Sequence, residues 1–139
     1  MTEPKRLFDC LDYLLEQGDK NDLLAGKENG EWKTYSTSRI KSLVDELCAG
    51  LLHIGIGYGD STIEGRDKVA VISKNRPEWL ILDLAVQRSG AVLTPVYPTI
   101  NISELEFVLN DAQVKIMFVN NEEEYEKVAS IQQKVPSIR

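Results

Sequence analysis

Histidine and cysteine, which serve most often in catalysis and zinc binding, are rare in this sequence, and their spacing does not assemble them into a site. His53 is the single histidine among the 139 residues. Zinc sites that need more than one histidine are therefore excluded, and neither Cys10 nor Cys48 stands at metal-ligand spacing from it. We interpret His53 as a residue in the last turn of a helix, where a partial positive charge is favourable, and not as a catalytic base.

Asp83 is the one acid inside an apolar helical stretch. It has the chemistry of a functional carboxylate, but we expect a capped or salt-bridged structural group. Cys10 and Cys48 both lie in helical apolar patterns, so we expect two small buried thiols in a reducing compartment and no disulfide between them. The sequence thus predicts no catalytic residue, no cofactor-binding residue and no metal ligand.

Nucleotide-binding motifs are missing from the sequence. Residues 55–59, GIGYG, have closely spaced glycines. Their spacing is not that of a dinucleotide loop, and they precede a predicted strand instead of linking a strand to a helix. No Walker loop follows any predicted strand. The strand ends at residues 73–75 and 119–121 lack the carboxylates of a metal-dependent receiver domain.

Residues 63–66, IEGR, match a protease recognition sequence that is common in engineered proteins. The tetrapeptide lies between Asp60 and Asp67, in the middle of the predicted domain. We therefore interpret it as an exposed native loop.

Composition points to an ordinary globular protein with no polyanionic partner. The chain is 42% hydrophobic and 27% charged, with a net charge of −6. It has no block of Lys and Arg, which argues against nucleic acid or an anionic membrane as the main partner. The longest apolar run, residues 79–86, is interrupted by Asp83 and falls far short of the ~20 residues of a membrane helix. We expect a cytoplasmic protein.

Apolar periodicity predicts the elements of the first half of the chain. It indicates an amphipathic helix over residues 6–17 and a long one over residues 40–52. Between them, Asn29-Gly30 tolerates positive φ at both positions and predicts a hairpin turn.

The second half alternates between strand and helix patterns. Continuous apolar runs at residues 69–73, 91–94 and 114–119 favour strands that are covered on both faces, as in a parallel sheet. Pro77 suits a first helical position and Gly90 a helix end. We expect a capping box of Ser103 and Glu106, and a final helix over residues 122–134.

The predicted fold class is therefore α/β: an open, mostly parallel twisted sheet of βαβ units, preceded by a helix, a hairpin and a long amphipathic helix. We divide the chain into residues 1–67, which hold the leading helices and hairpin, and residues 68–139, which hold the βαβαβα unit. Both belong to one incomplete domain.

Four segments in order resemble one family. They are EWKTYSTSRIKSLVDELCAGLLHIGIGYGD, VAVISKNRPEW, SGAVLTPVYPTI and ELEFVLNDAQVKIMFV. Together they resemble the N-terminal region of AMP-forming acyl-CoA synthetases, within the adenylate-forming ligase superfamily. The Tyr97–Thr99 segment is most similar to the long-chain fatty acid–CoA ligases.

The resemblance implies a parent enzyme that joins a fatty acid to CoA with ATP and Mg²⁺, releasing AMP and pyrophosphate. It implies that the remainder of the ligase is this chain's partner, and that two copies pair. Peripheral membrane association of the parent is a further implication. The family's phosphate loop, magnesium motif and catalytic lysine have no match here, so we expect an inactive fragment whose reading frame continues past Arg139. Residues 61–66, STIEGR, lengthen a usually short link and are interpreted as a surface insertion.

Two alternatives remain open. In the first, the chain is a self-sufficient α/β binding or regulatory module with closed polar sheet edges and a ligand at the carboxyl ends of its strands. In the second, the chain belongs to an adenylate-forming ligase for another acid, such as a medium-chain or aromatic one.

Overall fold

The computed structural model describes residues 3–139, so residues 1 and 2 of the predicted first segment lie outside it. The chain forms two compact units that interleave along the sequence. The first holds the residues up to Gly55 together with Arg76–Ser89, and the second holds Ile56–Asn75 and Gly90–Arg139. This grouping differs from the segments 1–67 and 68–139, which remain a prediction about the domain.

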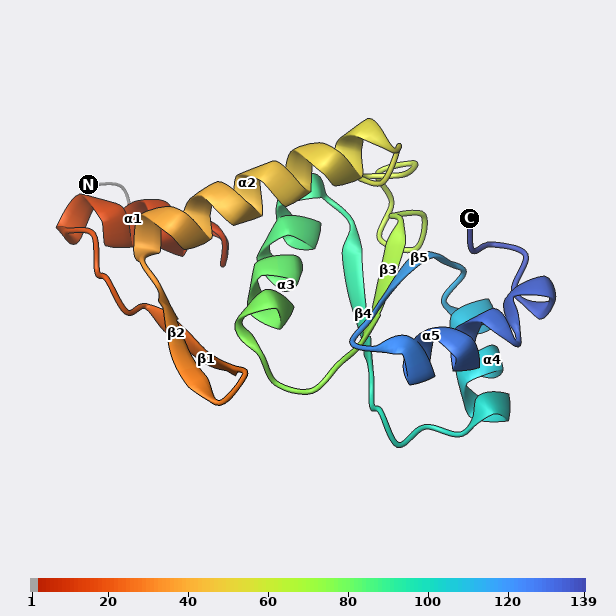
Figure 1. Ribbon diagram of the computed structural model, residues 1–139. Helices are drawn as coiled ribbons and strands as arrows, with labels where there is room; N and C mark the ends of the chain where they lie inside the picture. Colours follow the sequence, from red (N-terminus) through yellow and green to blue (C-terminus); the bar gives the residue numbers. More distant parts are fainter. Residues whose placement is uncertain (1–2) are drawn as a thin grey trace. The chain divides into compact units, whose positions relative to one another are not determined.

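The first unit combines a hairpin with three helices (Figure 1). Its elements are α1 (Asp9–Gln17), β1 (Leu24–Glu28), β2 (Glu31–Tyr35), α2 (Thr37–His53) and α3 (Pro77–Ser89). The strands pair antiparallel across Asn29 (φ 51°) and Gly30 (φ 86°), which confirms the predicted turn. Two successive positive φ values match the right-handed twist of the strands that the turn joins.

Helix α2 packs along α3 inside this unit. The Ser36 side chain accepts a hydrogen bond from Arg39 N–H at the start of α2. The helix buries one apolar stripe at three- and four-residue spacing: Ile40, Val44, Cys48 and Leu51. Helix α3 begins at Pro77, as predicted. The two helices are also joined by an ion pair between Asp45 Oδ1 and Arg88 Nε at 3.1 Å.

Helix α1 begins later than predicted, at Asp9 instead of Arg6. The Asp9 carboxylate accepts hydrogen bonds from the backbone and guanidinium of Arg6, the shortest at 2.8 Å, so Arg6 precedes the helix as a side-chain partner. The Arg6 guanidinium also lies 4.5 Å from the ring centre of Phe8. The helix ends before Gly18 (φ 134°), as expected.

The second unit is a three-stranded parallel sheet with helices, which confirms the α/β class and the open parallel sheet. Its elements are β3 (Lys68–Ile72), β4 (Val92–Val96), α4 (Ile102–Asp111), β5 (Val114–Val119), α5 (Glu122–Ala129) and a 3-10 helix, η1 (Gln132–Lys134). The strand order is β4-β3-β5, so β3 is central and its last four residues are buried. Pro95 lies opposite Val71 in β4 and has no N–H, which an outer strand tolerates.

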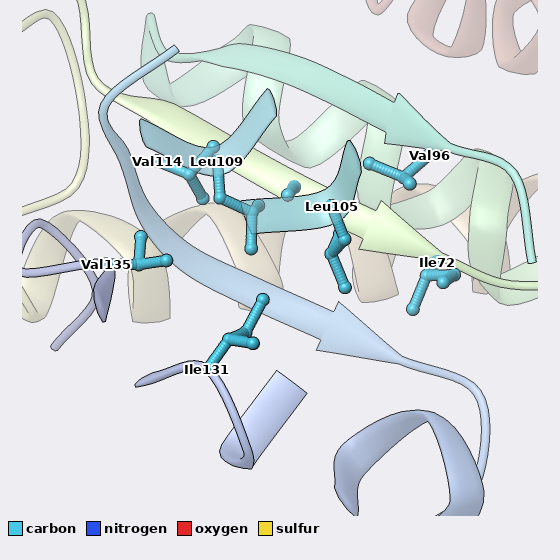
Figure 2. Packing of buried hydrophobic residues seen from close by; sticks show 8 residues of the cluster. Ile72, Val96, Leu105, Leu109, Val114, Ile131 and Val135 are labelled. Carbon is cyan, nitrogen blue, oxygen red and sulfur yellow. The ribbon is translucent and has the colours of Figure 1, made fainter. Parts of the chain in front are cut away.

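One apolar cluster holds this unit together (Figure 2). Leu105 and Leu109 of α4 are fully buried among side chains of the three strands and of the segment after α5. The other members are Ala70, Ile72, Val96, Val114, Ile131 and Val135. Burying each large aliphatic side chain contributes about 1.5–3 kcal/mol, so this cluster is the main source of the unit's stability.

Three local expectations are wrong. The cap of α4 is Asn101, whose Oδ1 accepts from Glu104 N–H at 2.9 Å, and not Ser103 with Glu106. The final helix ends at Ala129 and resumes only as η1. Cys10 is exposed, because α1 lies at the surface and buries only Leu11, whereas Cys48 is buried as expected. Both thiols are free, in line with the predicted lack of a disulfide.

Candidate functional site

The carboxyl ends of β3, β4 and β5 meet at one edge of the sheet, where open α/β folds bind ligands. The chain leaves β3 at Ser73 and β5 at Asn120. Ser73 Oγ lies 3.2 Å from Asn120 Oδ1, within hydrogen-bonding distance, so the loops after these two strands are tied together. Lys74 and Asn75 follow as exposed residues.

A hollow of about 370 Å³ lies at the same edge, just after β4. Its apolar wall comes from Val96, Ile100 and Val108, and its polar groups come from Tyr97, Thr99 and Glu104. Tyr97 is 83% exposed, so its ring is available at the rim. The hollow therefore offers an apolar surface with two hydroxyls and one carboxylate.

Hydrogen bonds from two helices fix the loop that forms this hollow. Ile100 N–H donates to the Tyr97 carbonyl at 3.0 Å, which closes a turn after β4. Asn101 then caps α4 by accepting a hydrogen bond from the Glu104 N–H, which fixes the first turn of the helix. The Lys127 ammonium of α5 donates to the Ile100 carbonyl. The loop is thus held in place by the same elements that pack on the apolar cluster.

The opposite, amino-terminal end of the sheet holds a buried carboxylate that the sequence reasoning missed. Asp67 is only 4% exposed, directly before β3. Its Oδ2 accepts from Gly57 N–H at 2.9 Å and its Oδ1 is ion-paired with the Lys115 ammonium of β5. Burial by itself would raise the pKa of Asp67, but the Lys115 ammonium and the Gly57 N–H outweigh it and lower the pKa from its ordinary value.

Asp67 has a structural role in this arrangement, because its carboxylate is paired with protein groups and lies at the end of the strands that α/β folds do not use for ligands. In the sequence Asp67 is followed by Lys68 and only then by the apolar residues of β3, so no local pattern marks it as a buried acid.

The residues weighed from the sequence do not come together in a site. His53 lies in the last turn of α2, as expected, and is exposed. Asp83 is half-buried and accepts a hydrogen bond from Gln87 Nε2 at 2.9 Å, which is a structural role. Burial raises the pKa of the Cys48 thiol, so the neutral form is favoured there. That the chain has no catalytic residue stays a prediction.

Two classes of feature are missing from residues 3–139. No group of three or more His, Cys, Asp or Glu side chains is placed to hold a metal ion. Among the same residues, no helix has the length and apolar character needed to cross a bilayer.

The chain is similar to known proteins over most of its length. The family model for AMP-binding enzymes matches residues 15–139. A long-chain-fatty-acid–CoA ligase of Mycobacterium bovis is 28% identical over 111 residues, which are 80% of this chain and 17% of that ligase. An acetyl-coenzyme A synthetase of Rubrobacter xylanophilus is 30% identical over 113 residues, 79% of this chain and 16% of the synthetase.

A solved structure shows the same fold. The crystal structure of a long-chain-fatty-acid–CoA ligase of Archaeoglobus fulgidus superposes with a TM-score of 0.79 at 22% identity, over 100% of this chain and 27% of the ligase chain. The sequence matches the N-terminal region of such ligases and spans about a sixth of the length of the curated relatives. With its four motifs in order and the family model matched from residue 15 onward, the chain belongs to the AMP-binding enzyme family.

Proposed function

We propose that this chain is the N-terminal scaffold of an adenylate-forming ligase that joins a long-chain fatty acid to CoA. The observation that carries the proposal is the match of the AMP-binding enzyme family over residues 15–139. The parallel sheet supports it, since its carboxyl edge leaves an apolar hollow beside Tyr97 and Thr99.

The proposed reaction has two steps. A carboxylate oxygen of the fatty acid attacks the α-phosphorus of ATP, and the bond to pyrophosphate breaks to leave an acyl-adenylate. The CoA sulfur, having lost its proton, then attacks the acyl carbonyl carbon and AMP leaves. Opposite charge near the phosphates stabilises such transfers.

Residues 3–139 hold no group of three or more His, Cys, Asp or Glu side chains placed for a metal ion, so they offer no site that would hold Mg²⁺ with protein ligands alone. We therefore assign the metal and the phosphates of ATP to parts of the ligase outside this chain. Glu104 also disfavours the hollow as the place of the reacting carboxylate, because like charges repel there. On this proposal the isolated chain catalyses neither step.

Substrate length separates the two ligase proposals. Long-chain ligases among the relatives and the Tyr97–Thr99 segment support a long acyl chain, while the acetyl-coenzyme A synthetase among the relatives supports a short one. The protein encoded by the whole reading frame that contains this sequence should be incubated with ATP, CoA and either palmitate, octanoate, benzoate or acetate. We expect palmitoyl-CoA and AMP to form fastest. Preference for acetate or benzoate would refute the long-chain assignment.

The proposed inactivity of residues 1–139 alone is tested by the exchange of labelled pyrophosphate into ATP with palmitate present. We expect no exchange above a protein-free blank, and exchange that grows with the amount of chain would refute the scaffold proposal. Static light scattering on the same sample tests the proposed pairing of two copies, since a monomer mass at every concentration contradicts it.

The hollow at the carboxyl edge is the one observation that favours a self-sufficient binding module. That alternative requires a sheet with closed polar edges, but β4 is an outer strand and its Val92 is 37% exposed. Titration of the isolated chain with ATP, AMP and CoA, followed by amide NMR shifts, separates the two. A saturating shift at Thr99 and Ile100 would favour the module over the scaffold.

A further inference from the structure

The loop between α2 and β3 carries the IEGR tetrapeptide, and its two ends are fastened to each other. Gly57 N–H donates to Asp67 Oδ2 at 2.9 Å, and Asp67 N–H donates back to the Gly57 carbonyl at 3.2 Å. Lys115 of β5 pairs with the same carboxylate. The residue that follows Arg66 is therefore buried and hydrogen-bonded through its side chain and its backbone.

The tetrapeptide itself is folded back on the loop. Gly65 N–H donates to Thr62 Oγ1 at 2.9 Å, and Asp60 N–H donates to the Gly65 carbonyl at 3.4 Å. A side chain at Gly59, which has a φ of 56°, would collide with the Gly65 carbonyl. These contacts give a compact turn in place of an extended strand.

Arg66 lies over the ring of Tyr58, which is 54% exposed. Its guanidinium carbon lies 5.7 Å from the centre of the Tyr58 ring, and its Nε atom is shielded from solvent. The Tyr58 ring is in turn packed on Gly90, where a Cβ would come within 2.6 Å of it. By contrast Ile63, at the start of the tetrapeptide, is 82% exposed.

A serine endopeptidase that cleaves after arginine needs that side chain in its own pocket and the flanking backbone extended in its cleft. The folded loop meets neither need, because Arg66 lies on Tyr58 and the Arg66–Asp67 bond adjoins a buried, doubly bonded residue. We propose that residues 63–66 are a masked cleavage site for an arginine-directed serine endopeptidase, opened only when the loop detaches from Asp67.

This masking makes cleavage a measure of local opening. When opening and closing are fast relative to cutting, the cleavage rate follows the population of the open form, so that each 1.4 kcal/mol changes it about tenfold. The exposed Ile63 and Glu64 do not by themselves make the bond cleavable.

The test uses the full 139-residue chain and factor Xa, a protease that cleaves after Ile-Glu-Gly-Arg, at neutral pH without denaturant. Mass spectrometry follows the fragments 1–66 and 67–139. A synthetic peptide of residues 60–70 supplies the unmasked rate. We expect the folded chain to be cut on the order of 100-fold more slowly than the peptide, because a clamped loop opens rarely.

Two variants release different parts of the mask. Tyr58→Ala removes the ring under Arg66 and should raise the cleavage rate about 2–5-fold, the factor for one cation–π contact at an exposed site. Asp67→Asn removes the ion pair with Lys115 and should raise the rate about tenfold or more, as expected for loss of a charge-assisted bond. Asp111→Asn, an exposed acid on α4 in the same unit, is the matched control and should leave the rate unchanged.

Circular dichroism melts identify any variant that unfolds. If the Asp67→Asn variant is unfolded, the cleavage rate of the folded Tyr58→Ala variant is the test of the proposal. A folded wild-type chain that is cut as fast as the peptide overturns the proposal. So does a folded Tyr58→Ala variant that is cut no faster than wild type.

Discussion

Gly57 and Asp67 exchange two hydrogen bonds, with the Gly57 amide 2.9 Å from Asp67 Oδ2 and the Asp67 amide 3.2 Å from the Gly57 carbonyl. The same carboxylate is paired with Lys115. One side chain thereby joins the loop after α2, the start of β3 and the second residue of β5.

Acid should weaken the second unit through Asp67. Burial opposes ionisation, but Lys115 and Gly57 lower the folded-state pKa below the unfolded value of about 3.9. The stabilisation by Asp67 is therefore fully present at pH values above the pKa of the unfolded state. It is lost as the pH falls through the pKa of the folded state. Urea unfolding between pH 2 and pH 8 should show this loss in the wild-type chain.

Replacing Asp67 with Asn should flatten that acid dependence and lower the plateau near pH 7 by about 1.5–3 kcal/mol, the range for a hydrogen bond to a charged group. Asp111→Asn is the control, since Asp111 is exposed. An Asp67→Asn chain with the wild-type pH profile would show that the ion pair contributes nothing.

Gly90 and Gly50 should respond oppositely to alanine. Gly90 has a φ of 88°, and a Cβ there would come within 2.6 Å of the Tyr58 ring. The conformation alone costs roughly 1–2 kcal/mol for a residue with a side chain. Gly50 lies inside α2 with nothing near its Cβ position, so Gly50→Ala should stabilise by about 0.5–1 kcal/mol. Thermal melts of both variants check the two signs.

Helix α4 should depend on Asn101 and hardly on Ser103. Asn101→Ala removes the acceptor for Glu104 N–H and should cost about 1 kcal/mol. Ser103→Ala removes only a hydroxyl that donates to Asn101 Oδ1 in solvent and should change stability by less than about 0.5 kcal/mol. The reverse order of unfolding free energies would restore the capping box of Ser103 and Glu106.

Trp79 should be less important for stability than its size suggests. Loss of a fully buried tryptophan costs ~3–5 kcal/mol, but Trp79 is only half-buried in α3. We expect about 1–3 kcal/mol for Trp79→Ala, because only part of its surface leaves water. Ile81, which is 5% exposed, is the comparison, and Ile81→Ala should lower the free energy of unfolding by about 2–5 kcal/mol.

Local chemistry was sufficient to predict much of the fold. Pro77 and Gly90 bracket α3 because each is suited to one end of a helix, and Asn29-Gly30 dictates its turn through positive φ. Continuous apolar runs correctly indicated a parallel sheet, but only β3 is buried along most of its length, and the expected cover on both faces is wrong for β4, of which Val92 and Pro95 are exposed.

Contacts between distant residues were not predictable in this way. Asp67 is an ordinary acid in the sequence, and only the pairing of β3 with β5 brings Lys115 to it. The cap of α4 was misplaced because Asn101 and Ser103 are both good cap residues, and the extended backbone of Asn101 decides between them. The hollow after β4 depends on the spacing between a loop and a helix, which no local pattern encodes.

Pro95 has a consequence for how this chain meets others. Because proline offers no amide proton, the free margin of β4 has a gap in the middle of its row of donors. A strand of another molecule cannot form a continuous row of hydrogen bonds along that margin. Many proteins use proline in an outer strand in this way to prevent amyloid-like stacking. β5 is the other outer strand and contains no proline, and the Arg139 N–H donates to its Lys115 carbonyl at 3.1 Å.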